Sequence, residues 1–189
     1  DGHTGLVVVD VSDPTNPIYT ANYGAPSGDS EVSAHDVAVS GDYAYIVGSY
    51  GKLEVVNVSD PTDPNRMGSY DSNASTYGVA VSGDYAYVAG GHTGLVVVDV
   101  SDPTNPTYAG SYNTDGYAVN VVVSGDYAYV TDGHTGLVVV DVSDPTNPTW
   151  AGYYNTIGYA YSVAVSGDYA YVASDDGGLV VVGPDSDGD

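Results

Sequence analysis

A repeat of 42 residues runs through almost the whole chain. The heptapeptide VSGDYAY occurs four times at this spacing, with its aspartates at Asp42, Asp84, Asp126 and Asp168. A second block, GLVVVDVSDPTNP in its full form, recurs with its leucines at Leu6, Leu53, Leu95, Leu137 and Leu179. A unit of this size does not bury an apolar face alone, so neighbouring units are expected to stack and share one core.

Each period is predicted to hold four strands, which in one copy span residues 117–123, 127–130, 137–142 and 149–154. Ser-Gly-Asp joins the first two as a tight hairpin, and the two prolines of SDPTNP separate the last two. The third strand, Leu-Val-Val-Val, is apolar at every position and needs cover on both faces. These features predict an all-β fold: a β-propeller, or a propeller-like arc of four-stranded antiparallel blades. A β-helix is the main rival, although its coils are usually shorter and lack such hairpins.

The composition favours β-strands and limits the kinds of molecule that the chain could bind. There are 20 Tyr and no Phe, and valine and tyrosine favour pleated sheets. The net charge of −23, with Lys52 and Arg66 as the only fixed cations, disfavours nucleic acid and anionic membranes. Most aspartates lie in SGD and SDP turns, where aspartate hydrogen-bonds its own backbone. No cysteine is present, so thiol catalysis and disulfides are excluded, and no apolar run approaches the length of a membrane span.

The strand signature LVVVD at Leu6, Leu95 and Leu137, preceded by VSGDYAYV and followed by VSDPTNP, resembles the LVIVD repeat family. This resemblance implies a β-propeller in secreted or surface-attached bacterial and archaeal proteins. It implies no shared catalytic motif.

The repeats assign residues 1–183 to LVIVD-type units: a partial first unit, then four that start near residues 32, 77, 117 and 158. Residues 184–189 form an acidic tail. The copies at Leu53, with Glu54 and Asn57, and at Leu179 depart from the pattern, which predicts edge or end repeats.

The strand count suggests how the chain ends are used. The pattern yields seventeen strands, one more than a four-bladed ring needs, and the duplicate is of the LVVVD type. The chain could be the tail of a larger propeller, close on itself, or donate its spare strand to a neighbouring molecule, which repeated head to tail gives a filament. Donation of the spare strand favours an extracellular structural protein, a subunit of a cell-surface layer or filament assembled by end-strand exchange.

A second hypothesis is a secreted glycan- or protein-binding adhesion module. Residues that vary at the start of each first strand are expected at one mouth of the central channel: His35, Asp36, Tyr77, Asn120, Tyr161 and Ser162. Variable polar residues on a constant scaffold favour a small-molecule, glycan or cation site, although the same residues could simply cap strand ends and hold water. Protein binding could use this mouth or the insertion 24–34. Four tyrosines near one loop could stack on sugars: Tyr153, Tyr154, Tyr159 and Tyr161.

Other chemistry is sparse. His3, His92 and His134 occupy equivalent loops and are expected to be exposed turn residues rather than metal ligands. Asp185, Asp187 and Asp189 offer the hard oxygens that calcium prefers, or form a solvated acidic tail. Asn57 and Asn73 stand in N-glycosylation sequons. Ser, His and Asp belong to repeated turns, whereas a catalytic site is needed once, so no enzyme and no other cofactor is expected.

Overall fold

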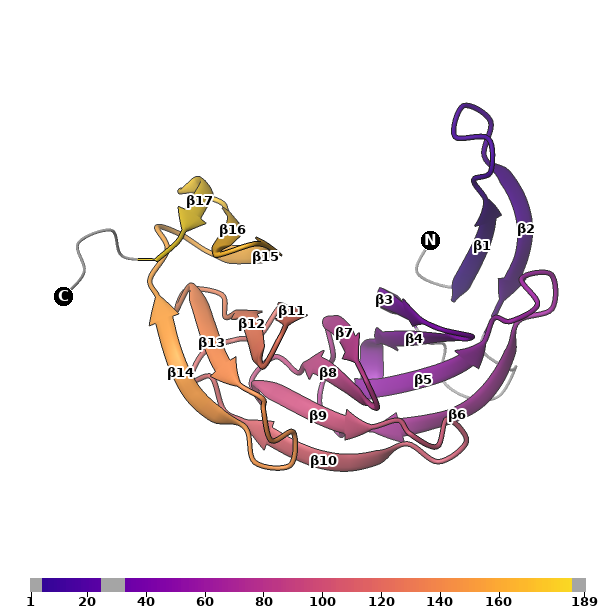
Figure 1. Cartoon of the computed structure of the whole chain (residues 1–189), viewed down its shortest axis with the longest axis horizontal. Coiled ribbons are helices and arrows are strands. Elements are labelled where there is room, and N and C mark those ends of the chain that lie inside the picture. The colour runs from indigo at the N-terminus through magenta and orange to yellow at the C-terminus, as the bar shows by residue number, and fades with distance from the viewer. Residues whose placement is uncertain (1–4, 25–32, 185–189) are drawn as a thin grey trace.

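The chain folds into five antiparallel sheets that follow one another around an open arc (Figure 1). This computed structural model describes residues 5–24 and 33–184. The first sheet is a half-blade of two strands, β1 (Leu6–Asp10) and β2 (Ile18–Tyr23). The last has three strands, β15 (Ala160–Ser166), β16 (Tyr169–Ser174) and β17 (Gly178–Val182). The described residues hold no helix with the length and hydropathy needed to cross a membrane.

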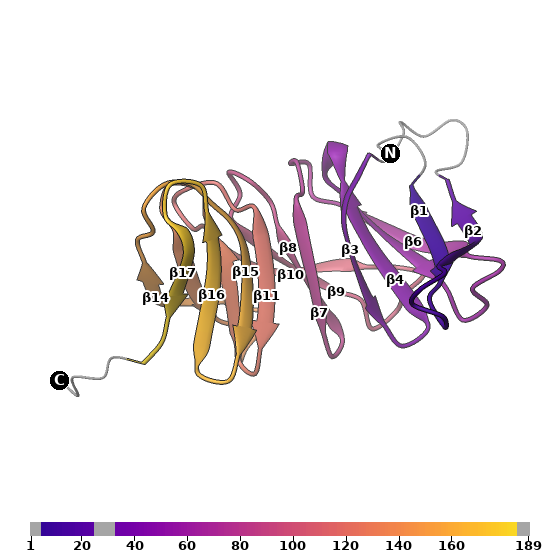
Figure 2. The same ribbon diagram turned by 90° about the horizontal axis from the view of Figure 1, so that it is seen from above.

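Between them lie three complete blades, and in each the strands pair in chain order with the first strand innermost (Figures 1 and 2). A short 3₁₀ turn spans Ser49–Gly51. The strands are β3 (Ala34–Ser40), β4 (Tyr43–Gly48), β5 (Lys52–Asn57) and β6 (Asn65–Asp71); β7 (Gly78–Ser82), β8 (Tyr85–Ala89), β9 (Leu95–Asp99) and β10 (Thr107–Tyr112); and β11 (Asn120–Ser124), β12 (Tyr127–Thr131), β13 (Leu137–Asp141) and β14 (Thr149–Tyr154). The predicted architecture of four-stranded antiparallel blades is confirmed.

The predicted strands of this third complete blade differ from the structure mainly at the start of β11, which begins at Asn120 rather than residue 117. Ala118 instead exchanges two backbone hydrogen bonds of 3.0 Å with Gly91, in the preceding blade. The hydrogen bonds that would have extended the strand therefore tie two blades together.

The apolar third strand is covered on both faces, as predicted. In β9, Leu95 and Val97 lie in one core cluster with Val138 and Val140 of the next blade. Val96 and Val98 lie in another, which includes Leu53 and Val55 of the preceding blade. All four β9 side chains are at most 6% exposed. Burying each contributes roughly 1.5–3 kcal/mol, so the strand binds its blade to both neighbours.

The aspartate-rich turns have the structural role predicted for them. Asp102 accepts hydrogen bonds from the Thr104 backbone N–H at 2.9 Å and from its hydroxyl at 2.7 Å. These bonds hold the pKa of Asp102 below its usual value. The turn they shape packs on the preceding blade, because a Cβ added at Gly68 would lie 2.7 Å from the Pro103 carbonyl oxygen. A glycine is therefore required in strand β6.

The prediction that the copy at Leu53 marks an edge or end repeat is wrong. Its strand, β5, lies inside the complete blade β3–β6, between the half-blade β1–β2 and the blade β7–β10. Glu54 is buried there, and its Oε1 lies 3.7 Å from the Arg66 Nε. A charged residue thus replaces the apolar valine of the repeat, and pairing with Arg66 makes the buried charge tolerable. The copy at Leu179 does lie at the end of the arc.

The ends of the arc remain apart. β1 and β17 belong to separate sheets at opposite ends, so closure of the chain on itself, one of the three possibilities considered, is not seen among the described residues (Figure 1). Core side chains at the end of the arc have no neighbouring blade to bury them: Leu179 is 68% exposed, whereas the equivalent Leu137 is 1% exposed.

We predict that Leu137→Ala and Leu179→Ala differ sharply in cost, although they change the same residue at equivalent positions. Leu137→Ala removes a buried side chain and should lower the free energy of unfolding by about 2–5 kcal/mol. Leu179→Ala should cost less than about 1 kcal/mol. Urea unfolding followed by circular dichroism, at a concentration where the chain is monomeric, measures both. Equal losses would contradict the packing described.

Candidate functional site

The predicted channel mouth carries a row of aromatic rings that crosses blade boundaries. His35, at the start of β3, stacks on Tyr77 with ring centres 5.4 Å apart and planes 12° apart. Tyr77 in turn contacts Tyr117 at 5.2 Å, and the Tyr117 hydroxyl donates a hydrogen bond to the Tyr77 hydroxyl. His92 meets the edge of Tyr117 at 4.7 Å. The row therefore joins three successive blades.

A second aromatic group continues this arrangement on the last two sheets. His134 meets the edge of Tyr159 at 5.0 Å, and Tyr159 lies 4.8 Å from Tyr161. His134 and Tyr161 are exposed, whereas Tyr159 is half-buried. Of the four tyrosines expected to cluster, Tyr159 and Tyr161 are in contact at the mouth, and Tyr153 and Tyr154 lie on the outer strand β14.

Tyr117 is a mouth residue that the sequence analysis missed. It lies two positions before the variable position that holds His35, Tyr77 and Tyr161. The signal was present, because Tyr117 and Tyr159 stand where the two earlier complete repeats have serine. The hydrogen bond to Tyr77, with burial as the second cause, raises the pKa of Tyr117 to about 12. The Tyr117 hydroxyl therefore stays protonated at neutral pH.

The polar residues predicted at the mouth join neighbouring blades. Asp36 Oδ2 accepts a hydrogen bond from the Val79 N–H of the next blade at 2.9 Å, and Asn120 Oδ1 accepts one from the Val163 N–H at 3.4 Å. The His35 Nδ1 lies 2.7 Å from the Thr76 carbonyl oxygen. One atom of each of these three side chains thus contacts the backbone of the next blade. Ser162 is exposed on β15.

The remaining sequence candidates do not converge on one site. His92 and His134 are exposed in loops of different blades, and the described residues contain no group of three side chains able to hold a metal. Asn73 is exposed in a turn at φ 55°, while Asn57 Oδ1 accepts bonds from the Ser59 backbone and hydroxyl. His3, the proposed calcium ligands Asp185, Asp187 and Asp189, and residues 25–32 of the insertion lie outside the described residues.

Asp132 is a buried carboxylate at a position that varies along the repeat. Equivalent positions hold Asp1, Gly48, Gly90 and Ser174. Asp132 is 0% exposed; the Thr114 hydroxyl donates to its Oδ1 at 2.5 Å, and its Oδ2 has no hydrogen-bond partner among the described residues. Burial raises the pKa of Asp132, against the lowering effect of the Thr114 hydroxyl.

We predict that Asp132→Asn stabilises the protein at neutral pH. Because the folded state raises the pKa of Asp132, the native protein holds this proton more tightly than the unfolded chain. The contribution of Asp132 to stability therefore falls as the pH rises above its ordinary pKa of 3.8. Asparagine keeps an acceptor for Thr114 without the charge, and should add about 1–3 kcal/mol at pH 7.

Urea unfolding of both proteins at pH 7 and pH 4 measures this effect, and the gain should shrink at the lower pH. Asp144→Asn is the matched control, because hydrogen bonds from Thr146 lower the pKa of Asp144. Its ionisation stabilises the native state, so its pH dependence should have the opposite sign. A gain for Asp132→Asn that is the same at both pH values would refute the prediction.

Comparison with known proteins agrees with this architecture. The sequence profile of the LVIVD repeat matches residues 1–24, 32–72, 74–114, 115–156 and 157–183. Two similar solved structures are the computationally designed proteins Ika8, with a TM-score of 0.75 and 8% identity, and Ika4, with 0.68 and 9%. Both have a β-propeller-like repeat fold. The alignment covers 96% of this chain and 53% of Ika8, and 82% of this chain and 94% of Ika4. No curated protein matches the chain.

Proposed function

This chain belongs to the LVIVD repeat family, and we propose that it is a non-catalytic structural subunit that joins further copies of itself by exchanging strands at the ends of its arc. The observation that carries this proposal is the exposure, at the two ends of the arc, of valines and of Leu179, whose equivalents farther inside the arc are buried. The partner predicted to cover them has the same repeat.

The N-terminal end lacks the two inner strands of its blade. Val37 of β3 is 45% exposed, whereas Val79, Val121 and Val163 at the same position are 2–6% exposed. Those equivalents are covered by the inner strand of the preceding blade. In front of Val37 only the outer pair β1–β2 is present among the described residues. A hairpin of the β15–β16 type would fill this gap.

The C-terminal end supplies such a hairpin. β15 and β16 pair as inner strands, and β17 occupies the third position, with Ala170 opposite Val182 and Val172 opposite Val180. β1 has the same Leu-Val-Val-Val sequence as β17 and brings its own partner, β2. β1 of a second copy could therefore replace β17 without changing the register, and would complete a four-stranded blade.

Exchange also improves burial. Val7 and Val9 are 47% and 43% exposed, and they are equivalent to Val180 and Val182 of β17. In β17's place they would pack on the blade β11–β14, while β15 and β16 would cover Val37. The aligned arc covers 53% of Ika8, so two copies together would match the length of that protein. Pairing that does not close gives a filament.

The proposal includes a location outside the cell or on its surface, in a layer or filament. This part is supported by what the family resemblance implies. Detection of the native protein in isolated surface layers or culture medium, rather than in cell lysate, is the expected result.

We predict that two deletions act in opposite directions. Removing residues 178–189 frees the edge of β16 and should tighten association at least about tenfold, because β1 of a second copy no longer competes with β17. Removing residues 1–17 deletes β1 and should abolish association. Sedimentation velocity over a concentration series measures both, and negative-stain microscopy separates closed rings from filaments.

Point variants provide the control. Val37→Asp places a charge in the proposed contact and should leave the chain monomeric. Tyr50→Asp changes a side chain that is 68% exposed in the loop between β4 and β5, and should leave association intact. A monomeric wild-type chain, or weaker association after removal of β17, would overturn strand exchange.

A further inference from the structure

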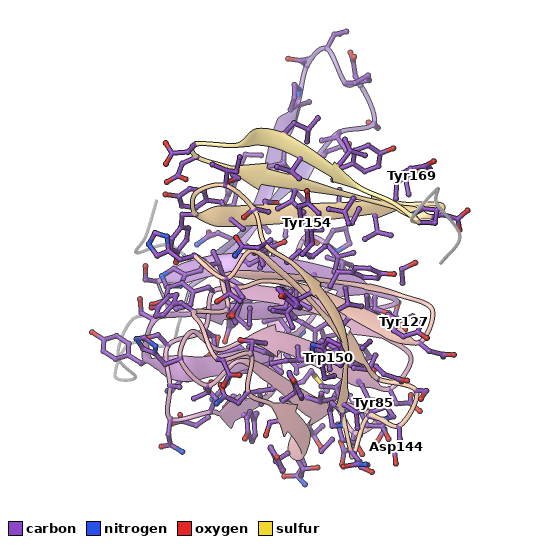
Figure 3. The ribbon with its side chains drawn as sticks, turned by 90° about the vertical axis from the view of Figure 1, so that its left-hand side faces the viewer. Tyr85, Tyr127, Asp144, Trp150, Tyr154 and Tyr169 are labelled. Carbon is purple, nitrogen blue, oxygen red and sulfur yellow. The ribbon has the colours of Figure 1, made fainter. Side chains whose placement is uncertain are left out.

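The outer surface carries a small pocket between the blades β7–β10 and β11–β14. Its volume is about 230 Å³, and its lining includes Tyr112, Asp115, Thr135, Trp150 and Tyr153. This rim pocket lies between two complete blades, so its walls do not depend on the open ends of the arc. Figure 3 looks onto the outer strand β14, on which Trp150 is labelled.

Two large aromatic side chains stand exposed at this pocket. Trp150 is 58% exposed and Tyr153 is 65% exposed. Exposing such large apolar surfaces is unfavourable for a folded chain alone, and adjacent exposed aromatics are typical of a binding surface. The equivalent residues of the preceding blade are Tyr108 and Ser111, whose hydroxyls are hydrogen-bonded at 2.9 Å. Trp150 and Tyr153 replace that self-contained pair with two rings.

The pocket lining also includes polar residues, beside the buried Val138. Asp115 is exposed at φ 64°, a left-handed conformation that aspartate tolerates, and its N–H donates to Asn113 Oδ1 at 3.1 Å. The adjacent Thr114 is held from behind by its hydrogen bond to the buried Asp132. Two departures from the repeat, Trp150 and Tyr153, therefore lie at one pocket. A repeat protein needs a ligand site only once, and such a concentration of departures is expected there.

We propose that the rim pocket binds a neutral carbohydrate, with Trp150 and Tyr153 packing on the apolar face of a sugar ring and Asp115 and Thr135 hydrogen-bonding its hydroxyls. The pocket is smaller than the roughly 300–1,000 Å³ typical of drug-sized ligands, which fits one ring of a longer chain. The net charge of −23 and the carboxylate of Asp115 disfavour acidic sugars. This site is independent of strand exchange at the arc ends.

Trp150 is the only tryptophan, so its fluorescence reports on this pocket alone. We would titrate the full chain with neutral hexasaccharides of β-1,4-glucose, β-1,4-N-acetylglucosamine, α-1,4-glucose and α-mannose, and with an acidic uronate hexamer. The expected result is a saturable change in Trp150 emission with at least one neutral sugar and none with the uronate. Choline tests the alternative that the rings bind a cation.

The neighbouring blade supplies variants that the fold already accommodates. Tyr153→Ser introduces the residue that the preceding blade has at the equivalent position, Ser111, and keeps the fluorescent Trp150. It should weaken sugar binding about tenfold or more. Trp150→Tyr introduces the equivalent residue of the preceding blade, Tyr108. It should weaken sugar binding to a similar extent, measured by calorimetry. Tyr108→Ser, outside the pocket, is the matched control and should leave the affinity unchanged. Absence of saturation with every neutral sugar, binding of choline alone, or an unchanged affinity in Tyr153→Ser would overturn the proposal.

Discussion

The packing of one blade's Leu-Val-Val-Val strand between its two neighbours is the contact on which the rest of the structure depends. In β9, alternate side chains belong to two different core clusters, one shared with each adjacent blade. A strand of this kind has no solvent face, so a blade buries it fully only with a neighbour on each side. At the open ends of the arc part of this cover is missing, and the core side chains of Val37 and Leu179 are exposed.

Polar groups fix the register of this apolar stack. Asp36 and Asn120 each accept a backbone N–H from the following blade, and aspartate turns such as that of Asp102 pack on the glycine of the preceding one. Hydrophobic burial is not directional, whereas these hydrogen bonds are. Together they explain how a uniform sequence gives a single arrangement of blades. They also explain why polar residues at a channel mouth need not indicate a ligand.

Residues that depart from the repeat then fall into two groups: those that contact a partner within the protein, and those that remain exposed. Glu54 is in the first group, because Arg66 pairs with it. The rings of His35, Tyr77 and Tyr117 are also in the first group, because they contact one another. Trp150 and Tyr153 remain largely exposed over the rim pocket. The proposal of a bound ligand therefore rests on Trp150 and Tyr153, although the sequence had indicated the channel mouth as the ligand site.

The sequence alone determined the repeat length, the four strands of each blade and the need for cover on both faces of LVVVD, because these follow from local periodicity and turn chemistry. It also located β14 at residues 149–154. It placed Leu53 at an edge and left Tyr117 out of the mouth, because whether Glu54 meets Arg66, or Tyr117 meets Tyr77, depends on residues one strand or one blade away. Only the tertiary structure decided which copies of the same strand are buried and which departures share a pocket, since both depend on how successive blades turn around the arc.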